Sequence, residues 1–206
     1  MRMPSSTKKR PLRRIPERPR GELRVSSVLD AAAAVISEVG YDAATMTEIA
    51  RRAESSIGTI YQYFRDKAAI GSALRERYGE ALSEELGSFA DLAPDLSVSA
   101  MVEQFVQIVT EFTNRHPAFL PLVVGKTTHN QDAAFRKRLR QRIGLLFQRK
   151  AKTMSADDAT RVANVSLQIL KGMQALISEA SFAEKERLRA EMTTALSAYL
   201  EAKLRS

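Results

Sequence analysis

Residues 45–67, TMTEIARRAESSIGTIYQYFRDK, constrain the fold more than any other part of the chain, because they predict two short helices around a tight turn. Thr45, with Glu48 three residues later, predicts a capping box in which each side chain bonds the other residue's amide. One apolar face of this first helix is formed by Ile49, Ala50 and Ala53.

The second short helix begins after two serines that break the apolar pattern. The hydroxyl of either Ser55 or Ser56 can cap it. We expect it to bury Ile57, Ile60 and Phe64 and to turn Thr59, Gln62 and Tyr63 outward. Two short helices, a tight turn and an exposed polar and aromatic face are typical of a helix-turn-helix DNA-binding motif.

The rest of the chain has the pattern of an all-α protein. Apolar residues recur at helical spacing from Val25 to Ile36, and Gly40 predicts the end of that helix. A long helix is expected from Asp66 to Leu86, followed by a connection at Gly87–Pro94. Later helices are expected at about 97–113, 131–152, 156–179 and 183–203, with a short apolar piece at 118–124. Ser155 with Asp158, and Ser181 with Glu184, predict the starts of the last two. We expect about nine helices and no strand.

Charge is distributed unevenly along the chain. Residues 1–22 carry a net charge of +6 out of +8 for the whole chain, and they contain four of the seven prolines. We expect this basic arm to be disordered on its own. It either contacts DNA beside the motif or serves as a solvated, solubilising extension. Residues 24–67 are nearly neutral, so the motif itself attracts phosphate weakly.

Composition excludes several classes of protein. The chain has no cysteine, which rules out disulfides and thiolate metal sites and fits an intracellular protein. No apolar run approaches the roughly 18 residues of a membrane helix, and the first residues lack the apolar core of a signal peptide. No nucleophile is paired with a base. We therefore expect a cytoplasmic protein with no enzymatic activity, cofactor, metal site or membrane association.

The segment GYDAATMTEIARRAESSIGTIYQYFRDK resembles the N-terminal domain of TetR-family transcriptional regulators. The resemblance also includes Arg24, which opens the first helix, and spans about 45 residues. It implies a helix-turn-helix domain at 23–68, after the arm at 1–22, and a helical ligand-binding and dimerisation domain at 69–206. Glu54 and Ser55 stand where the family usually has glycine and valine. Because glutamate adopts a positive φ only at some cost, we expect the turn to differ locally.

The resemblance implies that the helix at about Ile57–Phe64 enters the major groove of double-stranded DNA. Thr59 and Gln62 are expected to contact base edges, and Tyr61 and Tyr63 to donate to phosphates unless their rings serve as core. Phe64 is expected in the core. The other expected DNA contacts are Arg24, Thr45, Arg51, Ser55, Ser56 and Lys67, of which Arg24, Thr45 and Lys67 are expected to bind phosphates.

The C-terminal part carries aromatic and methionine side chains at helical positions. They form either plain core or an apolar pocket for a small-molecule effector, and the family resemblance favours a pocket lined by some of Phe105, Phe112, Phe147 and Met173. The last two helices carry more apolar faces than one pair can bury, which predicts a homodimer through a four-helix interface unless they form an ordinary core.

Two functions remain open. One is a ligand-responsive dimeric transcriptional regulator, most simply a repressor, that is released from a palindromic operator by a small apolar or amphipathic molecule. The other is a constitutive architectural DNA-binding protein with no effector. The helical domain of about 140 residues favours the first, since an architectural protein has no need of it.

Overall fold

The computed structural model describes residues 19–124 and 133–204, and these ranges contain nine α-helices and no strand. The predicted all-α fold is therefore confirmed. The helices are α1 (Pro19–Ala43), α2 (Met46–Arg52), α3 (Ile57–Tyr63), α4 (Lys67–Leu92), α5 (Val98–Arg115), α6 (Phe119–Val124), α7 (Ala133–Lys150), α8 (Ala156–Glu179) and α9 (Phe182–Leu204), with a 3₁₀ turn η1 at Ala93–Asp95. Residues 1–18, most of the basic arm, lie outside the described ranges.

Helix α1 begins at Pro19, earlier than the expected end of the arm at residue 22. Proline suits a first helical turn, because its missing amide proton would have no intrahelical partner there. The helix is interrupted at Gly40, whose φ of 79° is not helical. The predicted glycine stop is therefore confirmed, and the chain continues as a short turn of helix to Ala43.

Several helix boundaries follow their predicted caps. The Thr45 hydroxyl accepts a hydrogen bond from the Glu48 amide at 3.2 Å, and the Ser155 hydroxyl accepts one from the Asp158 amide at 3.1 Å. Half of the expected capping box at Thr45 forms, since the Glu48 carboxylate accepts from Arg51 instead of from the Thr45 amide. Helix α9 begins directly after Ser181.

The predicted connection at Gly87–Pro94 is wrong, because α4 continues through it to Leu92. Phe89 accounts for the continuation: its side chain is buried and its ring lies 6.4 Å from that of Phe105 on α5. This contact requires the helix to extend one further turn. Glycine at position 87 is tolerated inside the helix, and the chain turns only at η1, which contains Pro94.

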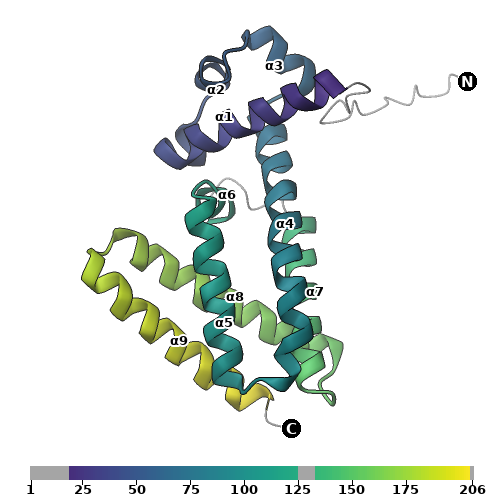
Figure 1. Ribbon diagram of the computed structural model, residues 1–206, viewed down its shortest axis with the longest axis vertical. Helices are drawn as coiled ribbons and strands as arrows, with labels where there is room; N and C mark the ends of the chain where they lie inside the picture. The colour runs from purple at the N-terminus through teal and green to yellow at the C-terminus, as the bar shows by residue number, and fades with distance from the viewer. Residues whose placement is uncertain (1–18, 125–132, 205–206) are drawn as a thin grey trace, which may run out of the picture.

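Figure 1 shows α1, α2 and α3 gathered at one end of an elongated molecule, with α4 running from that end along the remaining helices. The start of α4 packs against the end of α1, while its second half packs among α5 and α7. The buried side chains of both parts form a single connected core. The expected domain boundary between residues 68 and 69 therefore falls inside a helix that both parts share.

A cluster of aromatic rings joins α4, α5 and α6 below the α1–α3 part. The Phe112 ring lies 5.1 Å from Phe119 and 4.6 Å from His116, and Tyr78 lies 6.3 Å from Phe112. Burial raises the pKa of Tyr78 and lowers the pKa of His116. Helix α6, which carries Phe119, also packs against α1. Within the described ranges, no helix is long and apolar enough to cross a membrane.

Candidate DNA-binding interface

Helices α2 and α3 are joined by a turn in which the chain reverses through Glu54. Its φ is 49°, in the left-handed region that favours glycine. The Ser55 amide donates to the Ala50 carbonyl at 3.0 Å and the Glu54 amide to the Arg51 carbonyl at 3.2 Å. These two bonds form the Schellman motif that commonly ends a helix. We expected the turn to differ locally because Glu54 replaces glycine. The backbone of Glu54 nevertheless adopts the left-handed conformation, so the expected difference does not occur at this residue.

Ser56 caps α3, which settles the choice left open between the two serines. Its hydroxyl accepts from the Thr59 amide at 3.1 Å and lies 2.8 Å from the Thr59 hydroxyl. Thr59 is therefore half-buried, and its hydroxyl is already engaged in the free protein. Ile60 and Phe64 are fully buried and fix α3 to the hydrophobic core. Their predicted core roles are confirmed.

The exposed residues of α3 include Ile57 and Tyr61, which are one helical turn apart, and Gln62, which follows Tyr61. Tyr61 is 51% exposed, so its ring is not a core element, and Gln62 is exposed beside it. The predicted burial of Ile57 is wrong, since 41% of it is accessible. Ile57 is the first residue of α3 and precedes Tyr61 by four positions, so the two side chains are neighbours on the helix surface.

Ile57 is the residue of this face that sequence reasoning missed. Hydrophobic spacing assigned it to the core, although isoleucine at the first helical position has no preceding turn to cover it. An exposed aliphatic side chain on a major-groove helix can contact the methyl group of thymine. Gly58, also exposed, lies next to it and leaves room for close approach of the backbone.

Arg24 and Ser55, both expected at DNA, contact each other. The Arg24 guanidinium donates to the Ser55 hydroxyl at 3.2 Å, and Ser55 donates to the Ala53 carbonyl at 3.1 Å. Ser55 is thus half-buried under the turn, where it ties α1 to α2 and α3. Arg24 stays exposed and lies beside the turn, within the same surface as the start of α3.

Lys67 occupies a structural position at the start of α4. Its ammonium group donates to the Tyr41 carbonyl at 2.9 Å and to the Asp42 carbonyl at 2.8 Å, and it lies 5.0 Å from the centre of the Tyr41 ring. Two of its three donors are therefore used to hold α4 against the end of α1. One donor remains for the phosphate contact expected of it. Tyr63 is half-buried against the core.

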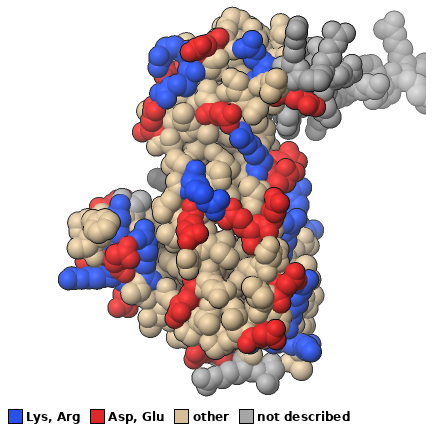
Figure 2. Space-filling model, viewed as in Figure 1, with Lys and Arg blue, Asp and Glu red and all other residues tan. Residues whose placement is uncertain are grey.

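The two arginines of α2 are paired with carboxylates. Arg51 bonds Glu48 at 2.6 Å and Arg52 bonds Glu38 at 2.6 Å, and these guanidinium groups lower the pKa of both carboxyls. Figure 2 shows basic and acidic side chains interspersed over the visible face, including its α1–α3 end. Arg51 is exposed and can exchange its carboxylate partner for a phosphate, at the expense of one weak surface ion pair.

Of the four residues expected to line an effector pocket, two share a cavity in the structure, and Phe112 and Met173 lie elsewhere. Phe105 and Phe147 border a very small internal cavity, and Phe112 belongs to the aromatic cluster with Tyr78. Met173 is half-buried on α8. Of the four, Phe105 also lines a larger cavity between α4, α5 and α7. Within the described ranges, no three acidic or histidine side chains are grouped as metal ligands are.

Comparisons with known proteins agree with this geometry. Residues 28–74 match the family model of bacterial regulatory proteins of the tetR family, and residues 97–200 match the model of the tetracyclin repressor-like C-terminal domain. The HTH-type transcriptional regulator BetI of Serratia proteamaculans is 37% identical over 84 residues, which cover 39% of this chain and 42% of BetI. The A-factor receptor protein of Streptomyces griseus is 42% identical over 50 residues, or 24% of this chain and 18% of that protein. The matched segment thus spans less than half the length of these relatives.

Solved structures share the fold over nearly the whole chain. A TetR-like transcriptional regulator from Rhodococcus sp. RHA1 superposes with a TM-score of 0.60 at 20% identity, covering 93% of this chain and 98% of that one. A TetR-family transcriptional regulator from Streptomyces coelicolor gives a TM-score of 0.56 at 23% identity, covering 87% and 98%.

Proposed function

The chain belongs to the TetR family of bacterial regulatory proteins, which are transcriptional regulators, and we propose that it is a dimeric repressor released from a palindromic operator by a small apolar or amphipathic molecule. The observation that carries the proposal is the outward face of α3. Ile57, Tyr61 and Gln62 are exposed on a helix that is fixed to the core through the fully buried Ile60 and, directly after the helix, Phe64. A rigid helix with such a face suits insertion into the major groove.

Gln62 and Ile57 are the proposed base-reading residues. A glutamine amide can bond adenine through two hydrogen bonds, and the isoleucine can contact a thymine methyl. Tyr61, Tyr63, Arg24, Arg51 and Thr45 are proposed to contact the DNA backbone and to set the position of α3 without reading sequence. Ser55, Ser56 and Thr59 shape the turn and the start of α3, and the Thr59 hydroxyl lies 2.8 Å from the Ser56 hydroxyl in the free protein.

Dimerisation is proposed through α8 and α9. Val165 and Leu176 lie eleven residues apart on one face of α8 and are 39% and 55% exposed. The exposed face of α9 carries small side chains at Ala195, Ala198 and Ala202, which permit close approach of another helix. Two such pairs would form a four-helix interface about a twofold axis and present two copies of α3 to a palindrome.

Release by a ligand is proposed to act through α4. Its first turns hold Tyr41 of the DNA-binding part, and its last turns supply Leu86 and Phe89 to the cavity between α4, α5 and α7. A ligand that changes the tilt of α4 would move the two α3 helices of a dimer away from the spacing of about 34–36 Å that one turn of DNA requires. A hundredfold loss of DNA affinity needs about 2.7 kcal/mol of preference for the DNA-free shape.

An architectural DNA-binding protein is the alternative function, and nuclease protection separates the two. A repressor protects one or a few defined sites that saturate at low protein concentration. An architectural protein coats DNA without a boundary as its concentration rises. Continuous coating at every concentration would overturn the proposed repressor. The cytoplasmic location and the lack of enzymatic activity expected from the sequence remain predictions.

A further inference from the structure

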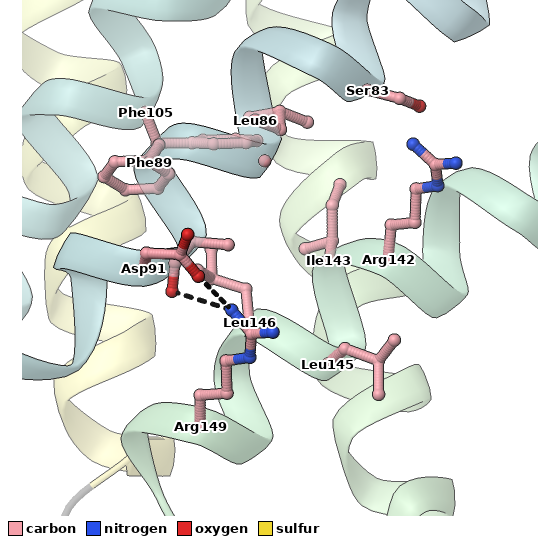
Figure 3. A pocket seen from close by; sticks show the side chains of 12 residues that line it. Ser83, Leu86, Phe89, Asp91, Phe105, Arg142, Ile143, Leu145, Leu146 and Arg149 are labelled. Carbon is pink, nitrogen blue, oxygen red and sulfur yellow. Dashed lines mark hydrogen bonds and ion pairs between the residues drawn. The ribbon is translucent and has the colours of Figure 1, made fainter.

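A cavity of about 190 Å³ lies between α4, α5 and α7, and its walls are apolar. Figure 3 shows Phe89 and Phe105 side by side on one wall, with Leu86, Ile143 and Leu146 around the space in front of them. An engineered cavity of about 150 Å³ with similar walls holds a benzene molecule. The cavity therefore has room for an apolar group of about six to eight carbon atoms.

The polar side chains that line the mouth of the cavity are Ser83, Asp91, Arg142 and Arg149, of which two are cationic and one is anionic. Arg149 donates to the Asp91 carboxylate at 3.0 Å and to the Ala90 carbonyl at 3.2 Å, so its charge is compensated. Arg142 is exposed, and no hydrogen bond or ion pair joins it to another residue of the described ranges. In Figure 3 its guanidinium points toward Ser83.

The charges at the mouth leave one guanidinium available for an anion. Glu76, Glu80 and Arg138 lie with Arg142 around a neighbouring hollow between α4 and α7, but neither carboxylate forms an ion pair with Arg142. The guanidinium carries parallel N–H groups that match both oxygens of a carboxylate. The Ser83 hydroxyl, which also lines the cavity, can donate a further hydrogen bond.

We propose that this cavity binds a small amphipathic carboxylate, with its apolar part against Phe89 and Phe105 and its carboxylate at Arg142. This inference rests on the proposed function, because the ligand would be the effector that moves α4. The proposed effector therefore carries a single negative charge and a short apolar group. A neutral or cationic molecule of the same shape would lack a partner for Arg142.

The experiment compares three probes of equal chain length on the full-length protein: octanoate, octanamide and octylamine. Calorimetric titration without DNA should show octanoate binding about tenfold more tightly than octanamide, since a carboxylate–guanidinium pair adds charge-assisted hydrogen bonds. Octylamine should bind no better than octanamide. The absence of octanoate binding, or equal affinity for octanoate and octanamide, would overturn the proposal.

Three variants locate the binding. Arg142→Met should reduce octanoate affinity to that of octanamide, whereas Arg138→Met, one turn earlier on the same exposed side of α7, should leave the tenfold difference intact. Gly87→Leu should weaken the binding of all three probes, because Gly87 lines the cavity and a leucine side chain would occupy part of it. The substitution should be tolerated in the fold, since a Cβ atom at this position meets nothing within 4 Å. Equal losses in the two arginine variants would indicate a general charge effect and contradict the assignment.

A separate measurement distinguishes this inference from the proposed function. DNA binding is followed with and without saturating octanoate. If octanoate binds as expected but DNA affinity is unchanged, the carboxylate site stands and ligand release through this cavity fails. If DNA is released by another molecule while octanoate does not bind, the regulatory function stands and the carboxylate site fails.

Discussion

Glu54 holds a backbone conformation that suits glycine, and the rest of the turn depends on it. Two hydrogen bonds close the turn around its φ of 49°, and Ser55 and Arg24 are bonded beside it. For a residue with a side chain, the left-handed conformation costs about 1–2 kcal/mol. The packing of α2 and α3 stabilises the domain enough to maintain it.

Replacing Glu54 by glycine should therefore stabilise the protein. We expect Glu54→Gly to raise the free energy of unfolding by about 1 kcal/mol in urea denaturation, after allowance for the greater freedom of glycine in the unfolded chain. Glu54→Ala is the matched control, because it removes the carboxylate but keeps the side-chain strain. Equal stabilisation by both variants would assign the effect to charge and contradict backbone strain.

The outward position of Gln62 leads to a second prediction. Gln62→Ala should relax base preference at one position of each half-site by about 1–3 kcal/mol, with the other positions unchanged. Tyr61→Phe keeps the ring and removes the hydroxyl. It should instead weaken binding to all DNA sequences by a similar factor. Binding to a set of single-base variants of the site measures both. An unchanged base profile in Gln62→Ala would remove this residue from sequence reading.

The contacts and exposure of individual side chains were harder to predict from the sequence than the helices or the fold. The caps Thr45 and Ser56 follow from local chemistry, because a hydroxyl before a helix has few other partners. The positions of Lys67 and Ser55 depend on Tyr41 and Arg24, which are distant in sequence, and periodicity carries no signal for such contacts. Ile57 was misplaced because spacing alone does not say whether a first helical residue is covered.

At the scale of elements, the end of α1 packs closely against the start of α4. The Tyr41 ring lies over Gly71, between Lys67 at 5.0 Å and the buried guanidinium of Arg75 at 5.7 Å from its centre. These three residues of α4 are one turn apart and form one face. A Cβ atom on Gly71 would lie 2.7 Å from the ring. Glycine is required there for packing, not for an unusual φ.

Two glycine-to-alanine changes in α4 should have opposite effects. Gly71→Ala should lower the free energy of unfolding by about 1–2 kcal/mol and weaken DNA binding, because it pushes Tyr41 off the helix. Gly87→Ala is in the same helix, but its Cβ atom would point into open space. This change should raise the free energy of unfolding by about 0.5–1 kcal/mol, because alanine has the higher helix propensity. Urea midpoints of the two variants measure this. A stabilised Gly71→Ala protein would show that the ring can move away freely.

Helix boundaries were largely predictable where a capping residue marks them. The expected helix at 156–179 agrees with α8, and that at 183–203 agrees with α9 to within one residue at each end. The failure at Gly87–Pro94 has the opposite origin: composition indicated a connection, but the contact of Phe89 with Phe105 keeps α4 intact. Tertiary packing overrides weak local signals of this kind.

At the scale of the whole molecule, α4 connects the α3 surface at one end with the cavity near the other (Figure 1). The two-part architecture was predictable from the motif and its resemblance. The cavity was not, because it arises where α4, α5 and α7 meet, and only Phe105 among the expected lining residues reaches it. Arg142 and Ser83 acquire their shared position from packing alone.

The proposed dimer is testable through exposed residues of α8. Leu176→Glu should convert a dimer into a folded monomer in sedimentation velocity, because a carboxylate would be buried without a partner in the interface. Leu176 suits this test because it is exposed, whereas Leu196 on α9 is buried within the monomer and a charge there would disrupt folding. Leu92→Glu, at an equally exposed leucine at the end of α4, should remain a dimer. A monomeric wild-type protein would contradict the interface.

The central claim, that paired α3 helices read a symmetric DNA sequence, is tested most directly by sequencing the duplexes that the full-length protein retains from a random pool. We predict enrichment of one motif with twofold symmetry, whose half-sites lie about 10–10.5 base pairs apart or a multiple of that spacing. Retained duplexes with the sequence distribution of the input pool, or an enriched motif without symmetry, would contradict the claim.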